Sequence, residues 1–251
     1  MNYRLLGVFV LSALTVIVIS RLQTTNTQAQ KGTPGLSPVE ADLLKEINQA
    51  RAQPQIYAGY LEKLKPHFNG KEYKTETLRV ETQEGWDAVE DAIRFLRSVT
   101  PAGPLSTSQG LCLAASSHVK DQSASGATGH AGEDQTLVEQ RVKPFGTWRG
   151  DIGENLVYGD ESARDRILTW LIDDGVASRG HRKRIMSQDY KVAGISCGPH
   201  PEYGAMCVLT LAGGFSDSAP SAASSSGTDK SKPSNNALEK PTKVKAPPKM
   251  P

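Results

Sequence analysis

Residues 162–184 read SARDRILTWLIDDGVASRGHRKR, and this stretch holds the clearest fold and site signals in the chain. We expect a helix from Ser162 to Asp174, because apolar side chains recur on one face at helical spacing. Gly175 then supplies a stop after the last turn. The inward positions are Ala163, Ile167, Trp170 and Leu171.

The end of this helix breaks a local rule. Asp173 and Asp174 place two carboxylates at the negative pole of the helix, which costs about 0.3–1 kcal/mol each. Such conflicts are expected mainly at functional or compensated positions. The cations that could compensate follow at once, at Arg179, Arg182, Lys183 and Arg184.

Around this stretch, helical patterns come first and strand patterns last. A capping box at Ser37 with Pro38 predicts a helix over 38–52, and Pro54 can open a second helix. Val89, Ile93 and Leu96 indicate a third, and a fourth begins near residue 108. Strands are expected at 155–158, 192–197 and 205–212. Together these segments predict one mixed domain over residues 36–215.

Two histidines stand out from the five in the chain. His130 lies in Ala-Thr-Gly-His-Ala-Gly, where glycine lets the backbone approach a ligand closely, and His181 follows Gly180. His67, His118 and His200 are weaker candidates, since His118 lies on the apolar face of its helix. Glu154 adds a carboxylate between a glycine and an apolar strand.

Two imidazoles and two or three carboxylates in separate glycine-rich turns are the ingredients of a divalent metal site or an acid/base cleft. The chain has no H-E-x-x-H, C-x-x-C pair or phosphate loop. The zinc-protease, paired-cysteine and nucleotide-binding signatures are therefore missing.

Four separated motifs together resemble the CAP superfamily, also called the SCP domain, of cysteine-rich secretory proteins, antigen-five allergens and plant pathogenesis-related proteins. They are the Gly-Glu-Asn-Leu of 153–156, the tryptophan helix of 170–175, the Ser-Arg-Gly-His-Arg of 178–182 and the Cys-Val-Leu-Thr-Leu-Ala of 207–212. The resemblance begins in Asn-Gln-Ala-Arg of 48–51 and ends at Phe215. The Asp-Asp-Gly and Arg-Gly-His-Arg forms are most similar to the microbial branch.

The resemblance implies an α+β fold, a single α-β-α sandwich with a central antiparallel sheet between helical layers. It also implies a cleft in which His130, Glu154, Asp173 and His181 surround a divalent metal, for which we expect zinc. Many relatives have glutamate at the position of Asp173, and Asp174 could take its place. The segment between His130 and Glu154 is long, and we expect part of it at the rim of the cleft.

Three functions are consistent with the resemblance. The first is a secreted binding or interaction module whose cleft holds a divalent cation. The second is a metal-dependent, peptidase-like hydrolase, in which the ion lowers the pKa of a bound water. The third is a lipid or sterol carrier. The partner is thus an unidentified protein, lipid or cell-envelope component, and we expect a monomer.

Composition limits these alternatives. The chain has 251 residues and a net charge of +2, of which residues 1–29 contribute +2 and residues 216–251 contribute +3. Residues 30–215 therefore carry −3, so the domain lacks the basic face that nucleic acid requires, and we expect no nucleic-acid partner.

Both ends of the chain have compositions unlike the domain. Arg4, the apolar run of 5–19 and the small residues before Ala29 predict a signal peptide over 1–29, with an uncleaved anchor as the alternative. With cleavage, the mature chain has no membrane span. Residues 216–251, rich in serine, proline and lysine, predict a disordered tail. The expected location is secreted or extracytoplasmic, within the cell envelope.

The three cysteines leave one question open. Cys197 and Cys207 flank a turn-rich stretch between two apolar runs, and they can form either a disulfide or two small core residues. Cys112 would then remain an unpaired thiol.

Overall fold

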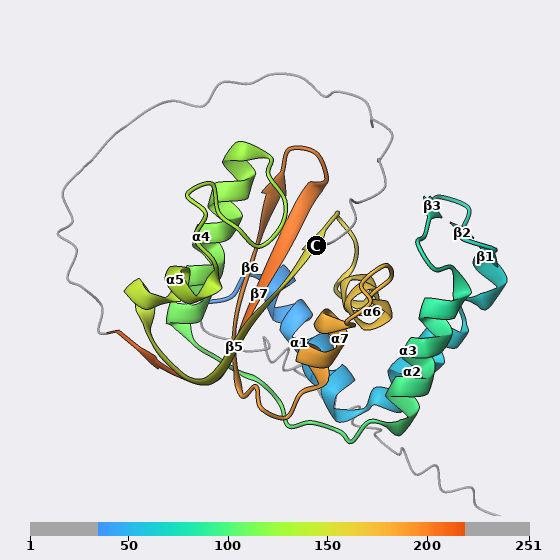
Figure 1. Ribbon diagram of the computed structural model, residues 1–251, viewed down its shortest axis with the longest axis horizontal. Helices are drawn as coiled ribbons and strands as arrows, with labels where there is room; N and C mark the ends of the chain where they lie inside the picture. Colours follow the sequence, from blue (N-terminus) through green and yellow to red (C-terminus); the bar gives the residue numbers. More distant parts are fainter. Residues whose placement is uncertain (1–34, 219–251) are drawn as a thin grey trace, which may run out of the picture. The chain divides into compact units, whose positions relative to one another are not determined.

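A computed structural model describes residues 35–218 of the chain. The expected signal peptide lies outside these residues, and so do residues 219–251 of the expected tail. The boundary expected at residue 215 was too early, because residues 216 and 217 belong to the last strand, Gly204–Asp217. The helices and strands of the described part follow the order drawn in Figure 1. The helices are α1 (Pro38–Ala52), α2 (Pro54–Glu62), α3 (Trp86–Ser98), α4 (Gln109–Ser125), α5 (Val138–Val142), α6 (Ala163–Ile172) and α7 (Gly180–Met186), with short 3-10 turns η1 (Lys65–His67) and η2 (Lys143–Phe145). The strands are β1 (Phe68–Asn69), β2 (Glu72–Lys74), β3 (Arg79–Glu81), β4 (Ser106–Thr107), β5 (Gly146–Tyr158), β6 (Val192–His200) and β7 (Gly204–Asp217).

The main sheet has the strand order β4-β6-β7-β5. Strand β7 lies in the middle and pairs antiparallel with β6 on one side and with β5 on the other. The resemblance implied an antiparallel sheet, and β5, β6 and β7 are antiparallel. The two-residue strand β4 is the exception, because it pairs parallel with β6. Strand β5 is an edge strand, so side chains from both faces of the sheet can meet along it.

The sheet is buried on both faces, which makes the fold an α-β-α sandwich. Met206, Val208 and Ala212 of β7 pack with residues of α4, whereas Cys207, Leu209 and Leu211 belong to the core that includes α1, α6 and α7. Figure 1 shows α4 on one side of the strands and α1, α6 and α7 on the other. This two-sided burial explains why residues 205–212 read as an almost continuous apolar run.

The strands extend beyond the expected segments. Strand β5 begins at Gly146 rather than at Asn155, and β7 continues to Asp217, because the two pair from Gly146↔Asp217 to Tyr158↔Met206 around a bulge between Arg149 and Ile152. The first half of β5 is polar and partly exposed, so no hydrophobic alternation marks it. A second, three-stranded sheet, β1-β2-β3, was not expected from the sequence.

Helix α4 lies unusually close to β6. A Cβ atom at Gly194 would fall 2.0 Å from the backbone carbon of Leu111 and 2.3 Å from the backbone nitrogen of Cys112. Only glycine leaves room for this contact. The packing of the outer helical layer therefore depends on one position of β6.

Cys197 and Cys207 form a disulfide. They are direct partners in the β6–β7 ladder, so the bridge joins two neighbouring strands next to their hairpin turn. This observation decides between the two alternatives left open by the sequence. Cys112 is a free cysteine, partly buried.

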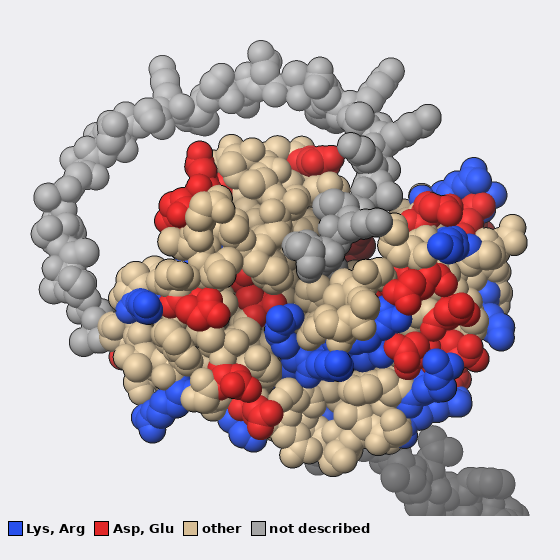
Figure 2. All heavy atoms as spheres, viewed as in Figure 1, with Lys and Arg blue, Asp and Glu red and all other residues tan. Residues whose placement is uncertain are grey.

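The surface carries charges of both signs. On the face shown in Figure 2, acidic and basic side chains are interspersed and do not gather into a single basic surface. Among residues 35–218, no helix combines the length and the apolar character needed to cross a bilayer.

Candidate functional site

His130 follows a glycine whose peptide is held by a buried polar cluster, which we call the Gly129 clamp and which consists of His118, Gln122 and Tyr158. The backbone N–H of Gly129 donates to the Tyr158 hydroxyl at 2.8 Å, and that hydroxyl donates to Gln122 Oε1 at 2.9 Å. The Gly129 carbonyl accepts from Gln122 Nε2 at 2.6 Å and lies 3.0 Å from His118 Nε2. The clamp fixes the backbone that presents the His130 ring.

Glu154 reaches His130 from β5. One carboxylate oxygen lies 2.9 Å from His130 Nδ1, and the other accepts from Arg141 Nη2 at 2.6 Å. Burial raises the pKa of Glu154, but the hydrogen bond from His130 and the charge of Arg141 outweigh it and hold the pKa below its usual range. Glu154 is therefore a charged, almost fully buried carboxylate.

Arg141 also holds the loop around His130. Its Nη1 donates to the carbonyl of His130 at 2.9 Å and to that of Thr136 at 2.7 Å. Arg141 lies in α5, within the long segment between His130 and Glu154 that was expected at the cleft rim. The sequence analysis did not identify Arg141, because no pattern in the chain distinguishes it from an ordinary helical arginine.

His181 and Asp173 form a second pair. Helix α6 ends at Ile172, two residues before the expected end, because Asp173 adopts the left-handed conformation with φ +57°. Its Oδ1 lies 2.7 Å from His181 Nδ1, and its Oδ2 accepts from the backbone N–H groups of His181 and Arg182 at 2.9 and 3.2 Å. The turn thus places both carboxylate oxygens of Asp173 at the start of α7.

Asp174 points elsewhere and does not join the histidines. Its oxygens accept from the backbone N–H groups of Gln83 and Glu84 at 2.6 and 2.8 Å, before α3. Both carboxylates at the end of α6 therefore have hydrogen-bond donors, which explains how the fold tolerates them. Asp173, not Asp174, is the residue placed beside His181.

Two of the expected compensating cations form a network with α3. Arg179 donates to both oxygens of Glu84 at 2.6 Å and to Asp91 at 3.2 Å, and Arg182 donates to the same Asp91 at 2.8 Å. Hydrogen bonds from Arg179, together with its charge, hold the pKa of Glu84 below its usual range, and the hydrogen bond and charge of Arg182 do the same for Asp91. This network fixes the α6–α7 turn, and with it His181, against α3.

The two histidine–carboxylate pairs meet at the edge of the sheet. The ring centroids of His130 and His181 lie 6.4 Å apart, with planes 22° apart. Glu154 lies in register with Thr210, on the α4 face, whereas the neighbouring Asn155 donates to the carbonyl of His181 on the α7 side at 3.2 Å. The structure therefore brings together all four residues expected in the cleft.

The other histidines have structural partners. His118 is completely buried within the Gly129 clamp, and burial lowers its pKa. His200 lies 3.0 Å from the carbonyl of Ala127 through Nε2, and its Nδ1 accepts backbone N–H groups of the β6–β7 turn. His67 stacks edge-on with Tyr73, at 5.9 Å between centroids. None of the three lies with the His130–His181 pair.

In both pairs Nδ1 is bonded to a carboxylate, which leaves Nε2 of each imidazole as the atom able to bind a metal. Carboxylates in this position fix the tautomer of a metal-binding histidine and raise its basicity. Within residues 35–218, no group of three or more His, Cys, Asp or Glu side chains is arranged to hold a metal ion. An ion at this position would therefore have two imidazoles as protein ligands, with Glu154 and Asp173 behind them.

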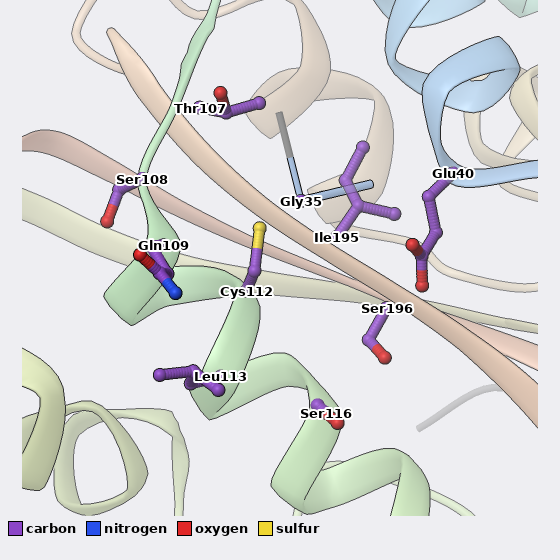
Figure 3. Close-up of a pocket in the computed structure, with 10 residues that line it drawn as sticks. All are labelled: Gly35, Glu40, Thr107, Ser108, Gln109, Cys112, Leu113, Ser116, Ile195 and Ser196. Carbon is purple, nitrogen blue, oxygen red and sulfur yellow. The ribbon is translucent and has the colours of Figure 1, made fainter. Parts of the chain in front are cut away.

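A separate pocket lies between the start of α1, the first turns of α4, and β6. Its volume is about 390 Å³, and its walls include Glu40, Cys112, Leu113 and Ser196 (Figure 3). Burial raises the pKa of the Cys112 thiol. The pocket contains none of the four cleft residues.

The family model of CAP, described as the cysteine-rich secretory protein family, matches residues 44–211, which is more than half of the chain. The chain belongs to this family. The match begins in α1 and ends in β7, so all four cleft residues of this CAP domain lie inside it. No curated protein matches the chain.

Solved structures similar to this CAP domain come from bacteria. An extracellular protein containing an SCP domain from Bacillus anthracis is 18% identical with a TM-score of 0.37, over 49% of this chain and 38% of its own. An outer surface protein of Borrelia burgdorferi is 16% identical with a TM-score of 0.37, over 44% of this chain and 78% of its own. A cysteine-rich secretory protein of Staphylococcus aureus is 18% identical with a TM-score of 0.32, over 50% and 37%. This chain thus spans well under half of the Bacillus and Staphylococcus proteins.

Proposed function

We propose that this CAP domain is an extracytoplasmic binding module whose cleft holds a divalent cation, zinc, between His130 and His181. The observation that carries the proposal is the pairing of each Nδ1 with a carboxylate, at 2.9 and 2.7 Å, which leaves both Nε2 atoms for the ion. Two protein ligands leave positions for water or for a group of the bound partner. The cation would supply a positive charge at which an electron-rich group of a partner binds.

The location has separate support. The chain belongs to a family described as secretory, and Cys197 and Cys207 form a disulfide, which persists mainly in oxidising compartments. The N-terminal segment has the pattern of a signal peptide. These observations favour a site of action in the cell envelope or outside the cell.

The test is a zinc titration of the purified chain after removal of metal with a chelator. Zinc should raise the melting temperature, because a ligand that binds only the folded state stabilises it. Alanine at His130 or at His181 should abolish the rise. The matched control is His67→Ala, which removes an exposed histidine from η1 and should leave the rise intact.

Two results would contradict the proposal. One is a melting temperature that zinc does not change in the parent chain. The other is a rise that survives in both the His130→Ala and the His181→Ala variants, since the ion would then be bound elsewhere.

A further inference from the structure

Arg184 differs from the other two arginines that follow the helix end. Arg179 and Arg182 pair with carboxylates of α3 or the turn before it. Arg184 is half-buried, yet it forms no ion pair with any Asp or Glu within the described part of the chain. A half-buried arginine whose charge is not matched by a carboxylate is suited to bind an anion.

The position of Arg184 follows from α7 and β5. It lies three residues after His181 on α7, and residues at this spacing are neighbours on a helix, with Cβ atoms about 5–6 Å apart. On β5, Gly153 and Asn155 face the same side. Asn155 donates to the backbone carbonyl of His181, and Gly153 lies against the side chain of Arg184, so α7 runs alongside this part of β5.

Gly153 leaves the space in which Arg184 lies. A Cβ atom there would be 3.0 Å from Arg184 Cδ, 3.1 Å from its Nε and 2.7 Å from the hydroxyl of Tyr190. Tyr190 is also hydrogen-bonded to Arg184. Burial raises the pKa of Tyr190, and the charge and hydrogen bond of Arg184 oppose part of that rise. At the other end, Arg184 Nη1 lies 3.3 Å from where a Cβ of Gly180 would be. The side chain is thus held between two glycines, next to His181.

Two acidic residues lie in the neighbourhood. Asp151 and Asp189 both raise the pKa of Tyr190 by their charge, yet neither forms an ion pair with Arg184. Asp189 accepts a hydrogen bond from Ser187 at 3.1 Å. The guanidinium therefore keeps its capacity for a carboxylate or a phosphate.

We propose that Arg184 binds the anionic group, a carboxylate or a phosphate, of the ligand whose other end reaches the cation between His130 and His181. This inference rests on the proposed function for the cation and adds the chemical class of the ligand. Gly153 then has a specific part, because any side chain there would displace the arginine.

The test uses the full chain without metal, labelled with nitrogen-15, and two probes at matched ionic strength, sodium phosphate and sodium acetate. The Nε–Hε signal of Arg184 should shift saturably with at least one probe, and the stronger probe identifies phosphate or carboxylate as the preferred group. Backbone signals of Gly180 and His181 report the same binding in variants. In Arg184→Gln the affinity should fall by about tenfold or more, the loss expected for one charge-assisted pair.

The matched control is Arg149→Gln. Arg149 is an exposed arginine of β5 that donates to the Ser216 hydroxyl at 3.5 Å, so its removal should leave the affinity unchanged. The inference is overturned if neither probe shifts the Arg184 signal in the parent chain, or if Arg149→Gln weakens binding as much as Arg184→Gln. Because the titration contains no metal, failure of the zinc experiment does not affect its outcome.

Discussion

Replacing Glu154 by glutamine keeps the size of the side chain and removes its charge from a buried cluster. Glu154 is 3% exposed and pairs with Arg141, whose side chain is 7% exposed. Removing one partner of a buried ion pair costs about 3–5 kcal/mol, because the other charge is left unmatched. Arg141 keeps two carbonyl acceptors, so we expect the lower end, about 3 kcal/mol.

The loss is to be measured as the free energy of unfolding in urea, with metal removed by a chelator. For a domain of this size, about 3 kcal/mol corresponds to a melting temperature lower by roughly 6–12 °C. The control is Glu139→Gln, a charge removed from the exposed side of α5, which should change stability by less than about 0.5 kcal/mol. Zinc affinity should fall by about 10–100-fold in Glu154→Gln, because His130 loses the group that orients it.

A double variant shows whether the ion pair causes the loss. Arg141→Met combined with Glu154→Gln should cost less than the sum of the two single variants, because the unmatched charge is gone. If Glu154→Gln alone stays within about 1 kcal/mol of the parent, or if the two losses simply add, the reasoning about the buried pair is wrong.

Three further predictions follow from the same contacts. The pKa of Glu154 is lower in the folded chain than in the unfolded chain, so its contribution to stability is present above the unfolded-state pKa and is lost as pH falls. In acid denaturation curves between about pH 5 and pH 3, the parent should therefore lose more stability than Glu154→Gln. Tyr158→Phe should cost about 1–3 kcal/mol and speed the hydrogen exchange of the Gly129 amide, because it removes a buried hydroxyl with two partners; exchange at the parent rate would refute the Gly129 clamp. Gly194→Ala should destabilise by about 3 kcal/mol or more in urea unfolding, while Gly59→Ala, in open space within α2, should stabilise by about 0.5–1 kcal/mol; equal effects would contradict the close approach of α4.

The sequence predicted α1, α2, α3, α4 and α6 because each has an apolar face at helical spacing, whereas the short helices α5 and α7 were not expected. Helix α1 begins and ends where its capping box and spacing indicate, at Pro38 and Ala52. The inward positions expected for α3, Val89, Ile93 and Leu96, are buried. In contrast, β1, β2 and β3 have only two or three residues each, too few for an alternating pattern to appear.

The candidate site was predicted as a set of residues but not as an arrangement. Glycine neighbours and the resemblance identified His130 and His181, yet the choice between Asp173 and Asp174 depends on a single left-handed residue at the end of α6. Adjacent aspartates in a sequence carry no sign of which will turn inward. Arg141 and the Gly129 clamp depend on contacts between segments far apart in the chain, which local patterns do not encode.

The disulfide between Cys197 and Cys207 fixes the register of β6 and β7 at the centre of the sheet. A shift of one residue between paired strands would turn every side chain to the opposite face, and it would also move the two cysteines out of opposition. The bond therefore closes only on the correct alignment and afterwards prevents slippage of β7, the strand on which β5 aligns. In a reducing compartment the disulfide does not form, and nothing then rejects the shifted register. A fraction of the molecules made there is expected to have a misaligned β6–β7 hairpin even where the helices are fully formed.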